Sequence, residues 1–207
     1  MRENEIKNDN TQGQGIGLEL TAIEILKRIG IKMGQIVLDF GCGSGTYTIP
    51  VAKIVGKKGR VYALDKDNNA LDNLMRKATL GRLENVRRMA TSGDVIIELP
   101  DESVDVTLLF DVFHRYYFPQ IADRRKLMDE IYRITKTQGF LSVWPKHMES
   151  AVKGEIEGAN FYLEKEYRGT LIHDNEDIET GKVMNFRKKP SPYENWIYSN
   201  KIFNADY

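Results

Sequence analysis

VLDFGCGSGTYT, residues 37–48, is the stretch of sequence that decides the fold of this chain. It begins as a short apolar run typical of a buried strand and continues into an acidic residue and a glycine-rich turn. Gly41, Gly43 and Gly45 allow positive φ and let a ligand approach the backbone without a Cβ in the way. Residues 46–54 then have the spacing of a helix whose free N-terminal amides would face that ligand. The stretch predicts a strand–turn–helix unit that binds a nucleotide-type ligand.

The glycine spacing differs from that of a dinucleotide-binding loop. A G-x-G-x-x-G pattern counted from Gly41 requires a glycine where this chain has Thr46, and Gly45 comes one position early. Asp39 would place a carboxylate beside the turn, where it repels a pyrophosphate and attracts an ammonium or a sulfonium. The charge therefore favours a cationic ligand over NAD.

Asp39, Gly41, Gly43 and Gly45 meet the pattern D-x-G-x-G-x-G. Through it the chain resembles the class I S-adenosylmethionine (SAM)-dependent methyltransferases, of the methyltransferase type 11 or ubiquinone–menaquinone-biosynthesis kind. GRVYALD, residues 59–65, indicates a second strand ending in Asp65, where an acid can accept hydrogen bonds from both ribose hydroxyls. The resemblance covers about residues 18–189. It implies SAM as cofactor, S-adenosyl-L-homocysteine as product, and methyl transfer by in-line displacement.

Strand and helix patterns alternate along the chain, which predicts an α/β fold. We expect a doubly wound, Rossmann-like sheet of seven mostly parallel strands, with helices on both faces and a C-terminal antiparallel hairpin. The last two strands are predicted at residues 161–172 and 183–188. We expect the chain to divide into three parts: a polar head or lid at 1–17, a methyltransferase domain at 18–189 and an aromatic-rich tail at 190–207.

Composition narrows the class of protein. The 207 residues carry 30 basic and 30 acidic side chains, a formal net charge of zero, which argues against a strongly electrostatic nucleic-acid binder. Short basic clusters such as residues 124–126 are expected to be solvated. No apolar run approaches the roughly 20 residues that span a bilayer, and we expect a cytoplasmic protein without a membrane partner. The single cysteine, Cys42, excludes an internal disulfide and a cysteine-rich metal site, and no metal is predicted.

Ligands of open α/β sheets lie beyond the carboxyl ends of the strands, so the loops there should form the cofactor site. The resemblance implies that the loop after the third strand borders the adenine, with Asp94 as acceptor for its amino group; Thr91 and Ser92 are the alternatives. The predicted cofactor-binding residues are Asp39, Gly41, Cys42, Gly43, Ser44, Gly45, Asp65, Lys66, Gly93, Asp94 and Asp111.

The methyl acceptor should lie near the loops that follow the fourth and fifth strands. His114 is the candidate general base, since an imidazole titrates near neutral pH; the alternative is a histidine that only lines the pocket. The predicted substrate-pocket residues are Phe113, His114, Tyr116, Tyr117, Lys146 and His147.

Three functions remain open from the sequence. The first is a methyltransferase for a small molecule; the second modifies a protein or RNA; the third binds SAM as a partner subunit without catalysis. The sequence after the fourth strand, DVFH at residues 111–114, lacks the N-P-P-Y-like tetrapeptide of exocyclic-amine nucleic-acid methyltransferases. The tail at 190–207 is a candidate contact for a homodimer.

Overall fold

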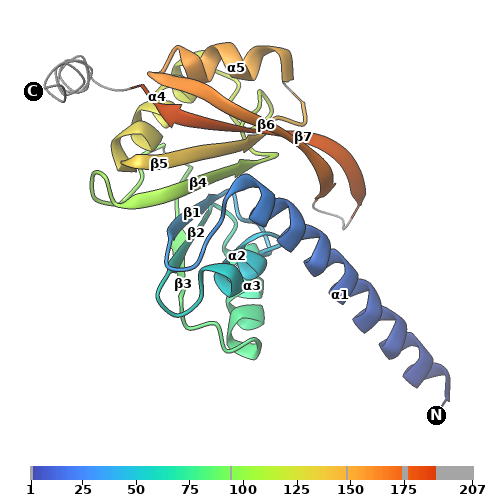
Figure 1. The fold of residues 1–207 in the computed structure, drawn as a ribbon. Helices are drawn as coiled ribbons and strands as arrows, with labels where there is room; N and C mark the ends of the chain where they lie inside the picture. Colours follow the sequence, from blue (N-terminus) through green and yellow to red (C-terminus); the bar gives the residue numbers. More distant parts are fainter. Residues whose placement is uncertain (1, 94, 148, 174–176, 190–207) are drawn as a thin grey trace, which may run out of the picture.

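A single mixed sheet forms the centre of the molecule (Figure 1). The structure is a computed structural model that describes residues 2–93, 95–147, 149–173 and 177–189, with the backbone alone for 2–14, 16 and 149. Within these residues the sheet has seven strands in the order β3-β2-β1-β4-β5-β7-β6. The strands are β1 (Ile36–Phe40), β2 (Arg60–Asp65), β3 (Val86–Ala90), β4 (Val104–Phe110), β5 (Thr135–Trp144), β6 (Phe161–Ile172) and β7 (Ile178–Lys188).

The pairing pattern confirms the predicted fold class. β1 pairs in parallel with β2 and β4, β2 with β3, and β4 with β5. β7 is antiparallel to both of its neighbours, β5 and β6. Consecutive parallel strands end at the same edge of the sheet, and strand order reverses between β1 and β4. The loops after β1, β2, β4 and β5 therefore converge at one edge, where ligands of this architecture bind.

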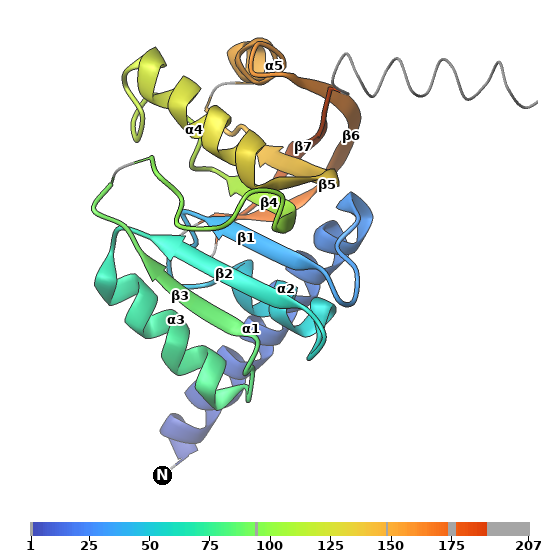
Figure 2. The same cartoon turned by 90° about the vertical axis from the view of Figure 1, so that its left-hand side faces the viewer.

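Helices cover both faces of the sheet, as predicted (Figure 2). One apolar core joins the sheet to α1 (Arg2–Ile29), α2 (Thr48–Val55) and α3 (Asn68–Leu80). A second core, on the other face, joins it to α4 (Ile121–Ile134) and α5 (Glu149–Glu157). Val37 lies in the first core and Leu38 in the second, because neighbouring strand residues point to opposite faces. Burial on both faces explains why the central strands are continuous apolar runs.

Several element boundaries differ from the sequence prediction. α1 starts at Arg2 rather than at residue 17, and Figure 1 shows its N-terminal half projecting from the body of the molecule. α2 starts two residues late because the turn continues through Gly45, whose φ of +92° does not fit a helix. β5 starts four residues early, directly after α4, and β7 starts at Ile178 instead of 183, because it pairs with β6 up to Ile172.

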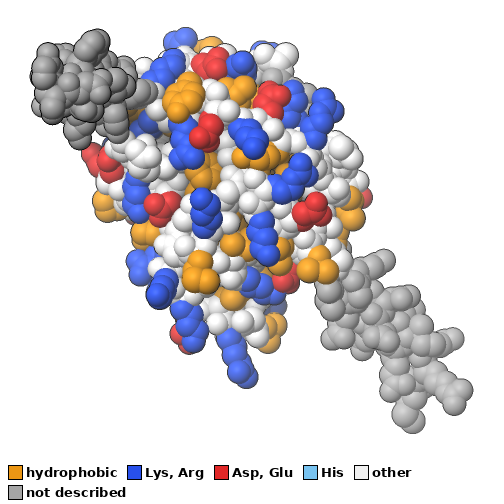
Figure 3. Space-filling model, viewed as in Figure 1, with side chains coloured by type: hydrophobic (Ala, Val, Ile, Leu, Met, Phe, Trp, Pro, Cys, Tyr) orange, Lys and Arg blue, Asp and Glu red, His pale blue; other side chains and the backbone are white. Residues whose placement is uncertain are grey.

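Two predictions fall on residues that the structure does not describe. The tail at 190–207, with its proposed dimer contact, and Asp94 lie outside the described residues. The lid role for residues 1–17 stays a prediction. Among the described residues, no helix combines the length and apolar character needed to cross a membrane. On the face seen in Figure 3, lysines and arginines lie among acidic, apolar and uncharged side chains rather than in one continuous stripe.

Candidate functional site

The glycine-rich turn after β1 is fixed by hydrogen bonds to the end of β2. The Gly41 N–H donates to the Leu64 carbonyl at 2.8 Å, and the Gly43 N–H donates to Asp65 Oδ2 at 2.8 Å. Gly45 packs so closely on α3 that a Cβ there would lie 2.3 Å from Leu74 Cδ1. The glycines are needed for both positive φ and close packing. The turn is therefore a rigid, preformed element.

A cavity of about 420 Å³ lies at the carboxyl edge, within the size range of small-molecule sites. Both its position at the switch between β1 and β4 and its mixed polar and apolar lining fit a nucleoside ligand. The predicted cofactor residues on its wall are Gly41, Gly43, Ser44, Asp65, Lys66, Gly93 and Asp111, with Thr91 from the adenine-side alternatives. The remaining lining residues are Phe40, Leu64, Asp67, Ala70, Phe110, Val112, Tyr117 and Phe118.

The charges on this wall favour a cation. Asp65, Asp67 and Asp111 contribute three carboxyl groups, and Lys66 is the one basic residue among the lining residues. Asp67 is committed to structure, since its Oδ1 accepts the N–H groups of Asn69 and Ala70 and caps α3. Asp65 also accepts two backbone N–H groups, those of Gly43 and Asp67, but its carboxylate has further lone pairs for a ligand, and Asp111 is the third acid on this wall. A polyphosphate would meet repulsion here, whereas an ammonium or sulfonium would not.

Asp39 lies behind the glycine turn and does not line this cavity. Its side chain is only 4% exposed, and its Oδ2 accepts a hydrogen bond from Thr48 Oγ1 at 2.5 Å. Burial raises the pKa of Asp39 to about 6; the Thr48 hydrogen bond opposes this rise and the nearby Asp65 charge adds to it. Cys42 is buried beside Asp39, and burial also raises the pKa of its thiol. The geometry gives both residues positions that support the turn.

A second, larger cavity of about 620 Å³ shares Asp111 and Tyr117 with the first. It contains four of the predicted substrate-pocket residues. Its lining residues are Asp111, His114, Arg115, Tyr116, Tyr117, His147, Ser150, Ala151 and His173. The two cavities are neighbours, so a cofactor in one and an acceptor in the other would meet at their common wall.

Phe113 and Lys146 were predicted in the substrate pocket, and the structure places them elsewhere. Phe113 is 1% exposed and packs in the core on the α4 and α5 face. The Lys146 ammonium lies 3.3 Å from Glu179 and over the ring of Trp144. For Phe113 the reason is that the chain turns at Asp111, whose φ is +54°, so neighbouring residues of the loop after β4 point to opposite sides. For Lys146, which follows β5, the ion pair with Glu179 of β7 decides the direction.

His114 lines the second cavity, and the groups beside its two ring nitrogens indicate which nitrogen carries the proton. Its Nδ1 accepts the Tyr116 N–H at 3.2 Å, so the neutral ring carries its proton on Nε2, which faces Asp111 Oδ1 at 4.0 Å. Burial lowers the pKa of His114, and His147 acts in the same direction, while Asp111 opposes both. The neutral ring is thus favoured. It presents a donor toward Asp111, and removing a proton from a substrate would require the Tyr116 hydrogen bond to break.

All three histidines of the chain meet at Asp111. His147 Nε2 lies 3.6 Å from Asp111 Oδ1, and His173 Nε2 lies 2.5 Å from Asp111 Oδ2. His173 follows β6 and is absent from the predicted site, because its loop reads as a polar connection in the sequence. The contact of His173 with Asp111 brings the end of β6 to the carboxyl end of β4. No local sequence pattern predicts this contact.

A buried arginine holds the loop that forms the acceptor side. Arg124 was expected on a solvated basic surface, but it is 3% exposed. Its guanidinium makes a two-point contact with the Glu155 carboxylate of α5, at 2.6 and 3.0 Å, and donates to the Phe118 carbonyl at 2.6 Å. The pair ties α4, α5 and residues 111–120 together. The expectation of a solvated side chain was therefore wrong for Arg124.

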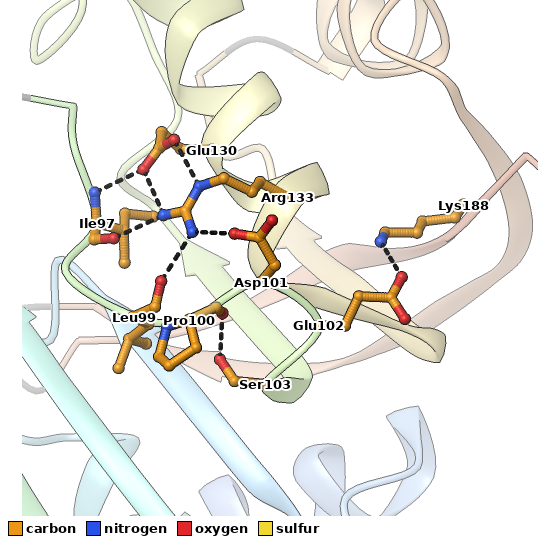
Figure 4. Close-up of polar contacts among 9 residues, drawn as sticks. All are labelled: Ile97, Leu99, Pro100, Asp101, Glu102, Ser103, Glu130, Arg133 and Lys188. Carbon is orange, nitrogen blue, oxygen red and sulfur yellow. Dashed lines mark hydrogen bonds and ion pairs between the residues drawn. The ribbon is translucent and has the colours of Figure 1, made fainter.

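A similar network fixes the loop between β3 and β4, which leads away from the cofactor cavity (Figure 4). Arg133 of α4 donates to the carbonyl oxygens of Ile97 and Leu99, both at 2.8 Å, and pairs with the carboxylates of Glu130 and Asp101. The Ile97 N–H donates to the same Glu130 carboxylate at 2.9 Å. Three backbone groups of this loop, the Ile97 N–H and the carbonyls of Ile97 and Leu99, are thus bonded by one guanidinium and one carboxylate.

Comparisons with known proteins agree with this geometry. A family model described as "Methyltransferase domain" matches residues 38–143. A demethylmenaquinone methyltransferase of Geobacillus stearothermophilus is 30% identical over 117 residues, 56% of this chain and 47% of that protein. A probable cobalt-precorrin-6B C(15)-methyltransferase (decarboxylating) of Saccharolobus solfataricus is 36% identical over 81 residues, 39% of this chain and 41% of that one. The chain therefore spans less than half the length of these relatives.

A solved structure extends the similarity to most of the fold. The crystal structure of a SAM dependent methyltransferase from Aquifex aeolicus matches with a TM-score of 0.66 and 25% identity. The match covers 82% of this chain and 90% of that chain.

Proposed function

This chain belongs to the methyltransferase-domain family, and we propose that it transfers the methyl group of SAM to a small-molecule acceptor. The observation that carries the proposal is the pair of adjoining cavities, about 420 and 620 Å³, that share Asp111 and Tyr117. The first is lined by the glycine turn and by carboxylates suited to a cationic nucleoside. The second, lined by residues that follow β4, β5 and β6, has the volume of a small-molecule site.

The residues of the first cavity would hold the cofactor. Asp65 ends β2, and its carboxylate already accepts the N–H groups of Gly43 and Asp67; a carboxylate has further lone pairs for the ribose hydroxyls. The turn at 41–45 lets the nucleoside approach the backbone closely. Gly93 and Thr91 line the side predicted for the adenine. SAM, once bound, supplies an electrophilic methyl group on a sulfonium.

The acceptor would lie in the second cavity, and the chain's contribution is chiefly alignment. Holding an acceptor about 3 Å from the methyl carbon and in line with the breaking bond can supply roughly 7 to 11 kcal/mol of the barrier reduction. Asp111 and Tyr117 line both cavities, so they set the distance between the two ligands. His114 lines the acceptor side, where its neutral ring presents the Nε2–H as a hydrogen-bond donor. The quinone and precorrin acceptors named for the relatives make a small, ring-containing acceptor our specific expectation.

The test is cofactor binding followed by methyl transfer. Titration calorimetry with SAM and with S-adenosyl-L-homocysteine should show one site per chain for each, and NAD should give no heat of binding. The protein is then incubated with methyl-labelled SAM and cell extract separated by molecular size. Label in the small-metabolite fraction is the expected result.

The other outcomes identify the alternatives. Label in protein or RNA would replace the small-molecule acceptor with a macromolecular one. Tight binding of SAM without transfer to any fraction would indicate a non-catalytic partner subunit. Binding of NAD in place of SAM would overturn the interpretation of the cavity charges.

A further inference from the structure

The Asp111 carboxylate has an unsatisfied oxygen in an enclosed position. Oδ2 contacts His173, but Oδ1 is buried and has no hydrogen-bond partner among the described residues. Two ring nitrogens approach Oδ1, His147 Nε2 at 3.6 Å and His114 Nε2 at 4.0 Å, and both are beyond hydrogen-bond range. A buried carboxylate oxygen without a partner is costly. A group that the described residues do not supply would relieve that cost.

We propose that Asp111, His147 and His173 form a binding site for a divalent transition-metal ion. One ligand atom from each residue can be chosen so that all of them lie within 4.8 Å of one another. Metal bonds of about 2.1 Å at angles of 90–109° place ligand atoms roughly 3.0–3.4 Å apart. The 3.6 Å separation of His147 Nε2 from Asp111 Oδ1 is close to that value, whereas the 2.5 Å separation of His173 Nε2 from Asp111 Oδ2 is shorter and would have to widen when an ion binds. A cation between these groups would use the orphaned oxygen.

Three separate strand ends hold the proposed ligands. Asp111 follows β4, His147 follows β5 and His173 follows β6. Asp111 adopts a left-handed backbone conformation, with φ +54°, and its N–H donates to the Trp144 carbonyl at 3.1 Å. The His173 N–H donates to the Asp177 carbonyl at 2.9 Å. The backbone thus aims side chains from different parts of the sequence at one point.

His114 is excluded from the ligand set by its own hydrogen bond. Its Nδ1 accepts the Tyr116 N–H, so its Nε2 carries the proton in the neutral ring and has no lone pair for a metal. Within the described residues, neither the His147 ring nor the His173 ring accepts a backbone N–H in this way. This difference makes His114 a matched control, since it lies in the same cavity and next to the same carboxylate.

The donor set selects the class of metal. Two imidazoles and one carboxylate suit Zn²⁺, Fe²⁺, Co²⁺ or Ni²⁺, whereas Mg²⁺ and Ca²⁺ prefer oxygen ligands alone. Three protein ligands leave positions open, and these face the cavity of about 620 Å³ that also contains Tyr116 and Ser150. An acceptor would reach the ion through a hydroxyl or carbonyl oxygen. This last point rests on the proposed function, while the metal site does not.

The experiment measures metal binding directly. The chain, freed of any affinity tag and treated with chelator, is titrated with Zn²⁺ by calorimetry and with Co²⁺ by visible absorption. We expect one ion per chain and a Co²⁺ spectrum of nitrogen and oxygen ligands. His147→Ala and His173→Ala should each weaken binding at least roughly 100-fold, because removing a ligand costs more than removing a group that only orients one. Asp111→Asn should weaken metal binding to the same extent, and asparagine keeps the side-chain volume and tolerates positive φ.

The matched control is His114→Ala, which should retain one ion per chain with affinity within a fewfold of the wild type. Because the chain has three histidines in total, the double variant His147→Ala/His173→Ala leaves only the control residue. Failure of the unaltered protein to bind either ion, or binding that survives in the double variant, would overturn the proposal. So would an equal loss in His114→Ala, since it would contradict the assigned ligands.

The same samples separate this proposal from the proposed function. SAM binding is measured on each variant, and neither His147 nor His173 lines the cofactor cavity. Retained SAM binding also shows that a variant is folded. Metal binding without SAM binding would refute the methyltransferase proposal alone, and SAM binding without metal binding would refute the metal site alone.

Discussion

Replacing Asp39 with asparagine should make the stability of this protein respond differently to pH. The carboxyl group is buried behind the glycine turn, and burial raises its pKa from 3.8 to about 6. A pKa difference of one between the folded and unfolded states corresponds to about 1.4 kcal/mol, so this rise is worth about 3 kcal/mol. Asp39→Asn keeps the shape and an oxygen that accepts the Thr48 hydroxyl, but it never carries a charge.

The sign of the stability change with pH follows from whether the folded or the unfolded state holds the proton of Asp39. Between pH 4 and pH 6 the folded protein keeps a proton on Asp39 that the unfolded chain has released, because the folded pKa is the higher one. The favourable contribution of the neutral group is therefore complete below pH 4 and is lost as the pH rises to about 6. Asp39→Asn does not lose it, so its stability relative to the wild type should increase by about 3 kcal/mol between pH 4 and pH 7.

Urea unfolding of the wild type, Asp39→Asn and Thr48→Val at pH 4 and pH 7 is the assay. Comparing variants at each pH cancels the titration of groups that they share. Thr48→Val removes the hydrogen bond that lowers the pKa of Asp39 and is the control of opposite sign, since it should lose stability relative to the wild type as the pH rises. A difference between wild type and Asp39→Asn that stays constant from pH 4 to pH 7, or that shrinks, would refute the reasoning.

Three further predictions concern the turn, the loop before β4 and the cofactor cavity. Gly45→Ala should destabilise the protein by at least about 1 kcal/mol more than Gly56→Ala in urea unfolding. Both glycines have positive φ, but only a Cβ at position 45 would meet Leu74. Equal losses of stability in the two variants would contradict this close contact. Arg133→Met should cost about 2 kcal/mol in thermal unfolding, since it leaves the Leu99 carbonyl without a donor and removes one of the two donors to the Ile97 carbonyl. Arg133→Lys should restore only part of this loss, and full recovery by lysine would argue against the role of the planar guanidinium. Asp65→Asn should weaken SAM binding at least roughly tenfold in calorimetry, because a charged acceptor becomes neutral while the turn keeps an oxygen for the Gly43 N–H; unchanged affinity would remove Asp65 from the proposed ribose site.

Much of the fold was predictable because its signals are local. The apolar runs of the central strands and the helix between Asn68 and Leu80 follow from spacing alone, and the structure gives that helix the predicted bounds. Boundaries were less predictable where tertiary pairing decides them. β7 begins at Ile178 because β6 provides a partner there, a long-range condition that the polar sequence of the loop conceals.

The candidate site divides in the same way. Gly41, Gly43 and Asp65 could be assigned to the cavity because each stands at a strand end that all sheets of this type place at one edge. Asp39 could not be placed, because its direction depends on the pleat of β1 and on the Thr48 hydroxyl. Phe113 and His114 are neighbours in sequence, yet one packs in the core and the other lines the cavity. Side-chain direction in a loop is set by the contacts that the loop makes.

By itself, the sequence determined the layered α/β architecture, the glycine turn and the class of cofactor, because periodicity, glycine spacing and strand-end acids are properties of short segments. Only the tertiary structure decided that Asp39 and Arg124 are buried, that two cavities share Asp111, and that His147 and His173 meet there. Asp111, His147 and His173 follow three different strands, and the first and last of them are 62 positions apart along the chain. Their meeting depends on how β7 pairs with β5 and with β6 at the edge of the sheet, and no local sequence pattern encodes that long-range pairing.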